Sequence, residues 1–271
     1  MGGSLMNATN RTAIMPVLFV GHGSPMNAVE DNEFRRGWEA VARGLPRPKA
    51  ALCISAHWET PGVSITAADH PETIHDFYGF PRKLFEIRYP APGAPDLAGR
   101  TAGMVKGTRV GLDGNRGLDH GCWSVLRAMY PAADVPVVQL SLDTSRPGAF
   151  HYQLARELAP LREQGVLIVG SGDIVHNLGI MDFGRADGYD WALRFNDEVK
   201  KRIEARDHRD LVDYQSLGPE ARLAIPTPEH YLPLLYTLAL QRDEDPVSFF
   251  NDKTVMGSVS MTCLTLGSAD R

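Results

Sequence analysis

The chain of 271 residues has little cysteine, no excess of positive charge and no long hydrophobic run. Its three cysteines, Cys53, Cys122 and Cys263, are odd in number and have no Cys-x-x-Cys spacing, which excludes a disulfide framework and a zinc ribbon. We therefore expect a reducing compartment, the cytoplasm. No segment approaches the ~18 uninterrupted apolar residues of a membrane span, and residues 1–12 lack the apolar core of a secretion signal.

Acidic residues outnumber basic ones by 33 to 28, so no overall positive field attracts nucleic acid or anionic lipid. The one dense basic run, at residues 200–202, lies in a helical pattern whose apolar stripe includes Phe195, Val199 and Ile203. This spacing indicates a solvated helix face. We expect small-molecule partners, no nucleic acid and no membrane, and we leave open whether the protein is a monomer or a homodimer.

Short apolar runs alternate with helical patterns along the chain. The apolar runs are residues 16–20, 50–56, 137–140 and 166–169, and the helical patterns are 33–43, 96–106, 123–130 and 149–164. This alternation predicts an α/β fold, a single domain over residues 14–271 with a mainly parallel central sheet flanked by helices, behind a mobile tail of residues 1–13. A last strand over residues 258–264, with one polar face, would lie at a sheet edge or line a pocket.

Histidine, with nine residues, is the abundant functional side chain. His22 and His57 directly follow apolar runs, and His176 follows another after a glycine-rich turn. His230 falls in the first turn of a helix expected from its N-cap Thr227 to about residue 240. Because the carboxyl ends of parallel strands meet at one edge, these imidazoles would converge there. Such a site suits Fe(II), Zn(II) or Cu(II), whereas Mg(II) and Ca(II) prefer oxygen ligands.

Two other motifs are weaker. The Gly-His-Gly-Ser-Pro segment at residues 21–25 is not the G-x-S-x-G turn that presents a nucleophilic serine. The Gly-Ser-Gly-Asp segment at residues 170–173 lacks the third glycine of a dinucleotide-binding loop. The histidines therefore carry the functional argument.

Eight segments occur in the order typical of one known family. They are residues 21–26, 55–58, 73–81, 89–93, 118–121, 170–172, 175–178 and 226–233. On these segments the chain resembles the DOPA-dioxygenase-type branch of the class III extradiol ring-cleavage dioxygenases, the superfamily that includes the catalytic subunit of protocatechuate dioxygenase. The resemblance implies that the protein opens the ring of a catechol, DOPA-like or related, with dioxygen at a non-haem metal centre.

The resemblance also implies a metal site. His22, His57 and His230 would hold Fe(II), and Zn(II) could occupy the same nitrogens. His176 either completes the coordination or acts beside it as the acid/base catalyst. Glu229 should point away from the ion, since adjacent helical residues project about 100° apart. The alternatives are a zinc-dependent hydrolase and a non-catalytic metal-binding or peptide-binding protein on the same scaffold.

Further residues are candidates for the substrate site. His120 would donate a hydrogen bond to substrate or oxygen, with Asp119 fixing its tautomer, or be structural. His75 and Asp76 would contact the polar tail of the substrate, or cap a turn. The remaining expectations are pocket walls at Trp58, Phe77 and Tyr231 and surface positions for His70, His151 and His208.

Overall fold

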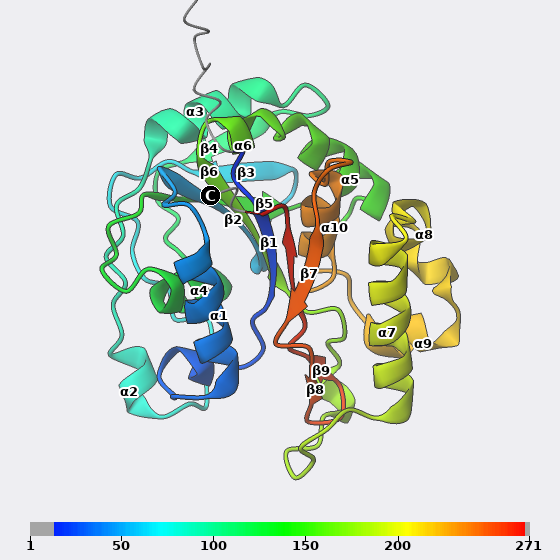
Figure 1. The fold of residues 1–271 in the computed structure, drawn as a ribbon. Coiled ribbons are helices and arrows are strands. Elements are labelled where there is room, and N and C mark those ends of the chain that lie inside the picture. Colours follow the sequence, from blue (N-terminus) through cyan, green and yellow to red (C-terminus); the bar gives the residue numbers. More distant parts are fainter. Residues whose placement is uncertain (1–13, 269–271) are drawn as a thin grey trace, which may run out of the picture.

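An eight-stranded sheet divides the molecule into two helical layers (Figure 1). The computed structural model describes residues 14–268, so the expected tail of residues 1–13 lies outside the described part. In spatial order the strands are β4 (Val110–Asp113), β3 (Val63–Thr66), β5 (Val137–Leu142), β2 (Ala50–Glu59), β6 (Val166–Gly172), β1 (Val17–Gly21), β10 (Cys263–Leu266) and β7 (Val247–Phe250). A separate hairpin pairs β8 (Thr254–Val255) with β9 (Val259–Ser260).

The centre of the sheet is parallel. Strands β5, β2, β6 and β1 are parallel neighbours, whereas β3 is antiparallel to β5, and β10 is antiparallel to both β1 and β7. The prediction of a single α/β domain with a mainly parallel sheet is therefore confirmed. Because β2, β6 and β1 run the same way, their carboxyl ends lie at one edge.

Side chains of each central strand alternate between two hydrophobic cores. In β1, Val17 and Phe19 pack in one core, and Leu18 and Val20 pack in the other. Helices α1 and α4 cover one face, and α3, α5 and α10 cover the other, with α7 to α9 outside them (Figure 1). The helices are α1 (Glu33–Gly44), α2 (Arg82–Phe85), α3 (Pro95–Met104), α4 (His120–Met129), α5 (Gly148–Glu157), α6 (Pro160–Glu163), α7 (Asp190–Glu204), α8 (His208–Val212), α9 (Pro219–Ala224) and α10 (Leu232–Ala239). Within residues 14–268, none is long and apolar enough to span a membrane.

Three predicted elements differ from the structure. The helix expected over residues 149–164 is two helices, since Pro160 has no amide hydrogen to continue the first. The last strand is divided into β9 and β10, and β10 lies between β1 and β7 instead of at an edge. Val259 of β9 lines a pocket, which is the other placement expected for this strand. Helix α10 begins at Leu232, so His230 lies in the turn before the helix and not in its first turn.

Two glycines of β6 allow the start of α10 to lie directly against the strand. A Cβ atom at Gly170 would be 2.4 Å from the carbonyl oxygen of Pro233, and one at Gly172 would be 2.1 Å from that of His230. The backbone amide of Asp173 donates to the same His230 carbonyl at 2.9 Å. This close approach brings His230 to the edge where β1 and β2 present His22 and His57.

We predict that Gly172→Ala destabilises the protein by about 1–3 kcal/mol, because the added methyl group forces the His230 segment away from β6. Urea denaturation measures the change. The control is Gly99→Ala in α3, where a Cβ atom meets nothing within 4 Å, and which should stabilise the helix by about 0.5–1 kcal/mol. Equal stability of Gly172→Ala and the unsubstituted protein would contradict the packing argument.

Candidate metal centre and active site

Five imidazole rings converge at the carboxyl edge of the sheet. His22 follows β1, His57 lies within β2, His120 is the first residue of α4, His176 follows β6, and His230 precedes α10. His22 Nε2 and His57 Nε2 are 3.0 Å apart, and one ring nitrogen from each of His22, His57 and His230 lies within 4.8 Å of the others. The structure thus brings together all four histidines predicted for the metal centre, together with His120.

Ser171 sets the tautomer of His22. The Ser171 hydroxyl donates its single proton to the Gly121 carbonyl at 2.6 Å, so its oxygen must accept the hydrogen bond of 3.0 Å from His22 Nδ1. His22 Nε2 then carries a lone pair directed toward the other histidines. Burial, reinforced by the neighbouring His230, His120 and His176, lowers the pKa of His22 well below its usual value and keeps the ring neutral.

Glu229 has the same role for His230. Its Oε1 accepts from His230 Nδ1 at 3.0 Å and from the Thr227 hydroxyl at 2.8 Å. Burial alone would raise the pKa of Glu229, but the hydrogen bonds from His230 and Thr227 oppose it, and the pKa is lowered to about 2. Burial also lowers the pKa of His230, so the pair is a carboxylate beside a neutral imidazole with its Nε2 lone pair free. Glu229 therefore orients His230 through Nδ1.

The nitrogen geometry fits a divalent transition metal. Two nitrogens bound about 2.1 Å from one ion, and about 90° apart, are about 3.0 Å from each other, which is the separation of His22 Nε2 and His57 Nε2. Asp173 supplies a second observation that fits a bound cation. Its Oδ2 is fully buried without a hydrogen-bond partner and lies 4.0 Å from His22 Nε2. A buried carboxyl oxygen beside neutral imidazoles fits a nearby positive charge.

His176 is stacked on His230, with ring centroids 3.4 Å apart and planes inclined by 11°. The lone pair of an imidazole nitrogen lies in the ring plane, so an ion in the plane of His230 would lie well out of the plane of His176. This geometry opposes binding of one ion by both rings. Burial, aided by His230, lowers the pKa of His176 to about 3, so the ring is neutral at neutral pH.

Asp76, not Asp119, holds His120. The Asp76 carboxylate accepts from the His120 backbone amide at 2.9 Å and from its Nδ1 at 3.0 Å, which leaves Nε2 available. Asp119 instead caps α4 by accepting from the Cys122 amide, and it also accepts from the Ser55 hydroxyl at 2.7 Å. The expected pairing of Asp119 with the His120 ring is thus wrong.

An apolar cavity of about 330 Å³ opens over the five rings. Its lining includes the five histidines and Asp76, together with Gly23, Ser24, Pro25, Phe77, Tyr78, Phe80, Leu178, Met181, Phe183, Met256 and Val259. The expected wall Phe77 and the expected contact Asp76 both lie on this cavity. An aromatic ring entering it would meet apolar walls with the imidazoles at its base.

Three residues predicted for the substrate site lie elsewhere. Trp58 is buried under the guanidinium of Arg116, 5.4 Å from the ring centre. Tyr231 is fully buried in the core, and its hydroxyl donates to the Leu211 carbonyl. His75 donates from Nε2 to the Ile87 carbonyl at 3.1 Å and is not part of the cavity lining.

Two histidines expected at the surface are not exposed. His151 is fully buried, where Nε2 donates to the Asp143 carbonyl and Nδ1 accepts from Tyr236. Burial lowers its pKa to about 4. His208 is half-buried between Tyr152 and Gln241, whereas His70 is exposed as predicted. The rings of His151 and His208 are structural hydrogen-bonding groups.

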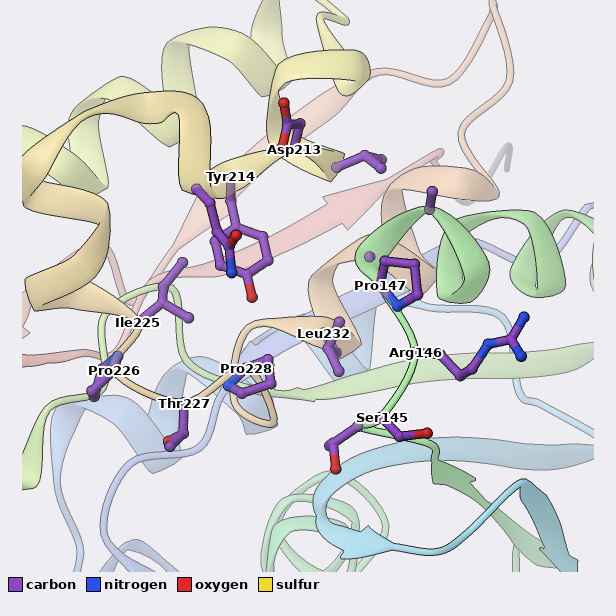
Figure 2. Close-up of a pocket in the computed structure, with 15 residues that line it drawn as sticks. Ser145, Arg146, Pro147, Asp213, Tyr214, Ile225, Pro226, Thr227, Pro228 and Leu232 are labelled. Atoms are coloured by element: carbon purple, nitrogen blue, oxygen red, sulfur yellow. The ribbon is translucent and has the colours of Figure 1, made fainter.

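A groove of about 590 Å³ lies outside this site (Figure 2). Tyr214, Ile225 and Pro228 line it, and Figure 2 shows Arg146 extending away from Tyr214. None of the five clustered histidines belongs to its lining. The candidate metal ligands therefore lie on the histidine cavity and not on this groove, and the histidine cavity is the candidate active site.

Sequence reasoning missed Ser171 and Asp173 as site residues. Both lie in the segment considered for dinucleotide binding, at the end of β6. Their position at the carboxyl end of a buried strand, which they share with His22, could have identified them as site residues. For Glu229 the sequence argues only against direct metal ligation, and it gives no sign of the hydrogen bond to His230.

Comparison with known proteins identifies the class. Residues 16–262 match the family described as the catalytic LigB subunit of aromatic ring-opening dioxygenase. A protein of Escherichia coli K12 named 4,5-DOPA dioxygenase extradiol is 46% identical, with 93% of this chain and 95% of the relative covered. A protein of the same name from Beta vulgaris is 39% identical, over 82% of this chain and 85% of its own. The crystal structure of an uncharacterized E. coli K12 protein superposes with a TM-score of 0.82 and 42% identity, covering 93% of this chain and all of that one.

The chain belongs to the family of the catalytic LigB subunit of aromatic ring-opening dioxygenases. Within that family it is an extradiol ring-cleaving dioxygenase, an oxidoreductase. Extradiol dioxygenases of this family depend on a non-haem metal, and the described part of this chain contains a His/Asp cluster that could hold one.

We predict that Glu229→Gln lowers the affinity for a divalent metal by about 10- to 100-fold, because His230 loses the carboxylate that orients it and favours its binding to a cation. Titration of the apo-protein with Co(II), followed by absorbance, measures the affinity. The control is Glu220→Gln, which removes a carboxylate of α9 that is paired with Arg194 of α7. Equal affinities of both variants would contradict the role of Glu229.

Proposed function

We propose that the protein opens the ring of a catechol with dioxygen at Fe(II) held by His22, His57 and His230. The observation that carries this proposal is the set of imidazoles with nitrogens turned inward beneath an apolar cavity. Bound Fe(II) would supply the redox link that lets dioxygen react with an aromatic diol. Zn(II) fits the same nitrogens and could replace Fe(II) in purified protein.

His176 is the proposed acid/base catalyst. It lines the cavity, and its stacking on His230 opposes a place among the ligands of the same ion. At a ring nitrogen, His176 would take a proton from a catechol hydroxyl and return it later. His120 is the proposed second catalytic residue, since Asp76 fixes its Nδ1 and leaves Nε2 for a hydrogen bond to substrate or oxygen.

The substrate is proposed to be a small catechol, and the apolar walls at Phe77 and Phe80 support entry of an aromatic ring. The names of the relatives make DOPA a natural first compound to test. All three cysteines are unpaired and buried, which supports a cytoplasmic location. A zinc-dependent hydrolase is the second candidate on the donor set alone, although the family match favours the oxygenase.

Anaerobic reconstitution tests the proposal. The apo-protein is loaded with Fe(II) or Zn(II), air-saturated catechol is added, and oxygen uptake is measured together with the absorbance of the ring-opened product. We expect oxygen uptake and product with Fe(II) only. Ester hydrolysis with Zn(II), with no oxygen uptake in the Fe(II) protein, would favour the hydrolase.

We predict that His176→Ala keeps its metal and loses at least about 100-fold in kcat, since general acid/base catalysis contributes roughly 10²–10⁴-fold. His57→Ala should instead lose the metal, because it removes a proposed ligand. Metal content by mass spectrometry separates these effects, and His70→Ala, at an exposed position, is the control. Loss of metal in His176→Ala would place that ring among the ligands.

A further inference from the structure

Asp76 lies beside two of the clustered rings. Its Oδ2 is 3.0 Å from His120 Nδ1 and 3.6 Å from His57 Nδ1. The rings of His57 and His120 are themselves neighbours, with centroids 3.9 Å apart. One carboxylate oxygen therefore adjoins both a proposed metal ligand and a proposed substrate contact.

The carboxylate has the capacity for hydrogen bonds to both rings. An ionised carboxylate has about four lone-pair positions and no hydrogen to donate. Oδ1 of Asp76 accepts from the backbone amide of His120, the first residue of α4, at 2.9 Å. Oδ2 accepts from the His120 ring and has a second lone pair that remains for Nδ1 of His57.

The position of Asp76 is fixed without any help from His57. The carbonyl oxygen of Ile74, two residues earlier, accepts from the indole nitrogen of Trp123 in α4 at 2.8 Å. Phe77, the next residue, lines the cavity and packs edge-on against the His120 ring, with centroids 5.5 Å apart. Asp76 is thus attached to α4 on both sides, and it can orient His57 from a fixed place.

His57 needs such a partner for its ring. Its backbone is already fixed, because its amide donates to the Ser55 hydroxyl and its carbonyl accepts from Arg116, both at 3.2 Å. A neutral ring that directs Nε2 at an ion must carry its hydrogen on Nδ1. Within residues 14–268, Nδ1 of His57 has no hydrogen bond, and its one charged neighbour is Asp76. The orientation of the ring is therefore left for Asp76 to set.

We infer that Asp76 is a positioning residue for both parts of the site, and that its Oδ2 accepts from Nδ1 of His57 as well as from Nδ1 of His120. These two hydrogen bonds direct Nε2 of His57 at the ion and Nε2 of His120 at the substrate or oxygen. The contact with His57 reaches the usual N–H···O distance of about 3.0 Å after a shift of about 0.6 Å. The inference rests on the proposed function and adds the residue that joins the metal ligand to the substrate contact.

Metal titration of a double-variant cycle tests the link to His57. Asp76→Asn should lower the Co(II) affinity of the apo-protein about tenfold, because loss of a group that orients a ligand costs roughly 10- to 100-fold. His120→Ala should keep the affinity within about twofold, and Asp76→Asn added to His120→Ala should again lower it about tenfold. The control is Asp31→Asn, which removes an equal charge from an exposed pair with Arg36 outside the cavity lining.

Turnover at saturating Fe(II) tests the link to His120. Asp76→Asn should lower kcat about tenfold and leave KM within about threefold, since the reacting group loses its orientation while the apolar walls stay. Once His120 is alanine, Asp76→Asn should lower kcat by no more than about twofold, because both changes act on the same ring. Equal losses of kcat in the two backgrounds would contradict the link to His120.

Proton NMR of the unsubstituted Zn(II) protein gives a test that needs no variant to fold. We expect the Nδ1 hydrogens of His57 and His120 to exchange slowly with water, since both are held by the Asp76 carboxylate. Rapid exchange at His57 beside slow exchange at His120 would overturn the inference.

The outcomes separate this inference from the proposed function. If no catechol is consumed, the proposed function fails, and the Co(II) titration and the NMR measurement still test Asp76. If catechol is consumed but Asp76→Asn leaves the Co(II) affinity of the His120→Ala protein unchanged, the inference is overturned and the proposed function stands. Binding of two Co(II) ions per chain would also overturn it, because Asp76, His57 and His120 would then form a cation site of their own.

Discussion

The packing of several imidazole rings against one another, away from water, is the constraint on which the site depends. Burial lowers the pKa of each of His22, His57, His176 and His230, and as neutral rings they can lie together without mutual repulsion. Neutral rings still have two tautomers, and only one presents a given nitrogen to the centre. Ser171 and Glu229 make that choice for two of the rings, so the polar groups behind the histidines are as much a part of the site as the histidines themselves.

Most of the fold follows from local patterns in the chain. The buried runs that became β1, β2, β5 and β6 are apolar on both faces, which is the pattern of strands covered by helices on both sides. The failures occur where a tertiary contact overrides a local signal. Thr227 and Pro228 are good helix-start residues, yet α10 begins later, because the Thr227 hydroxyl is bonded to Glu229 and the His230 carbonyl is held by the Asp173 amide. The bond between Asp173 and His230 joins residues far apart in the sequence, so the local pattern that marks a helix start cannot reveal it.

The sequence was enough to predict which histidines cluster, but not which groups hydrogen-bond to them. Strand-end positions were enough to bring together His22, His57 and His176, since topology alone places them at one edge. The partner of His120 was assigned to its sequence neighbour, Asp119, whereas the partner in space is Asp76, 44 residues away. Trp58 and Tyr231 show the same limit, because a residue next to a proposed ligand in sequence faces the opposite side of the strand or turn and enters the core.

The spread of the proposed ligands along the chain has a consequence for how the protein matures. His22 and His230 are separated by more than two hundred residues, and their rings meet only when β1, β6 and the turn before α10 have all docked. The unfolded chain therefore has no preformed chelate, and a metal ion cannot nucleate folding as it does in a zinc finger. At these proposed ligands, loading would be a late event on an already folded scaffold, and the ion would raise the stability of the native state by mass action.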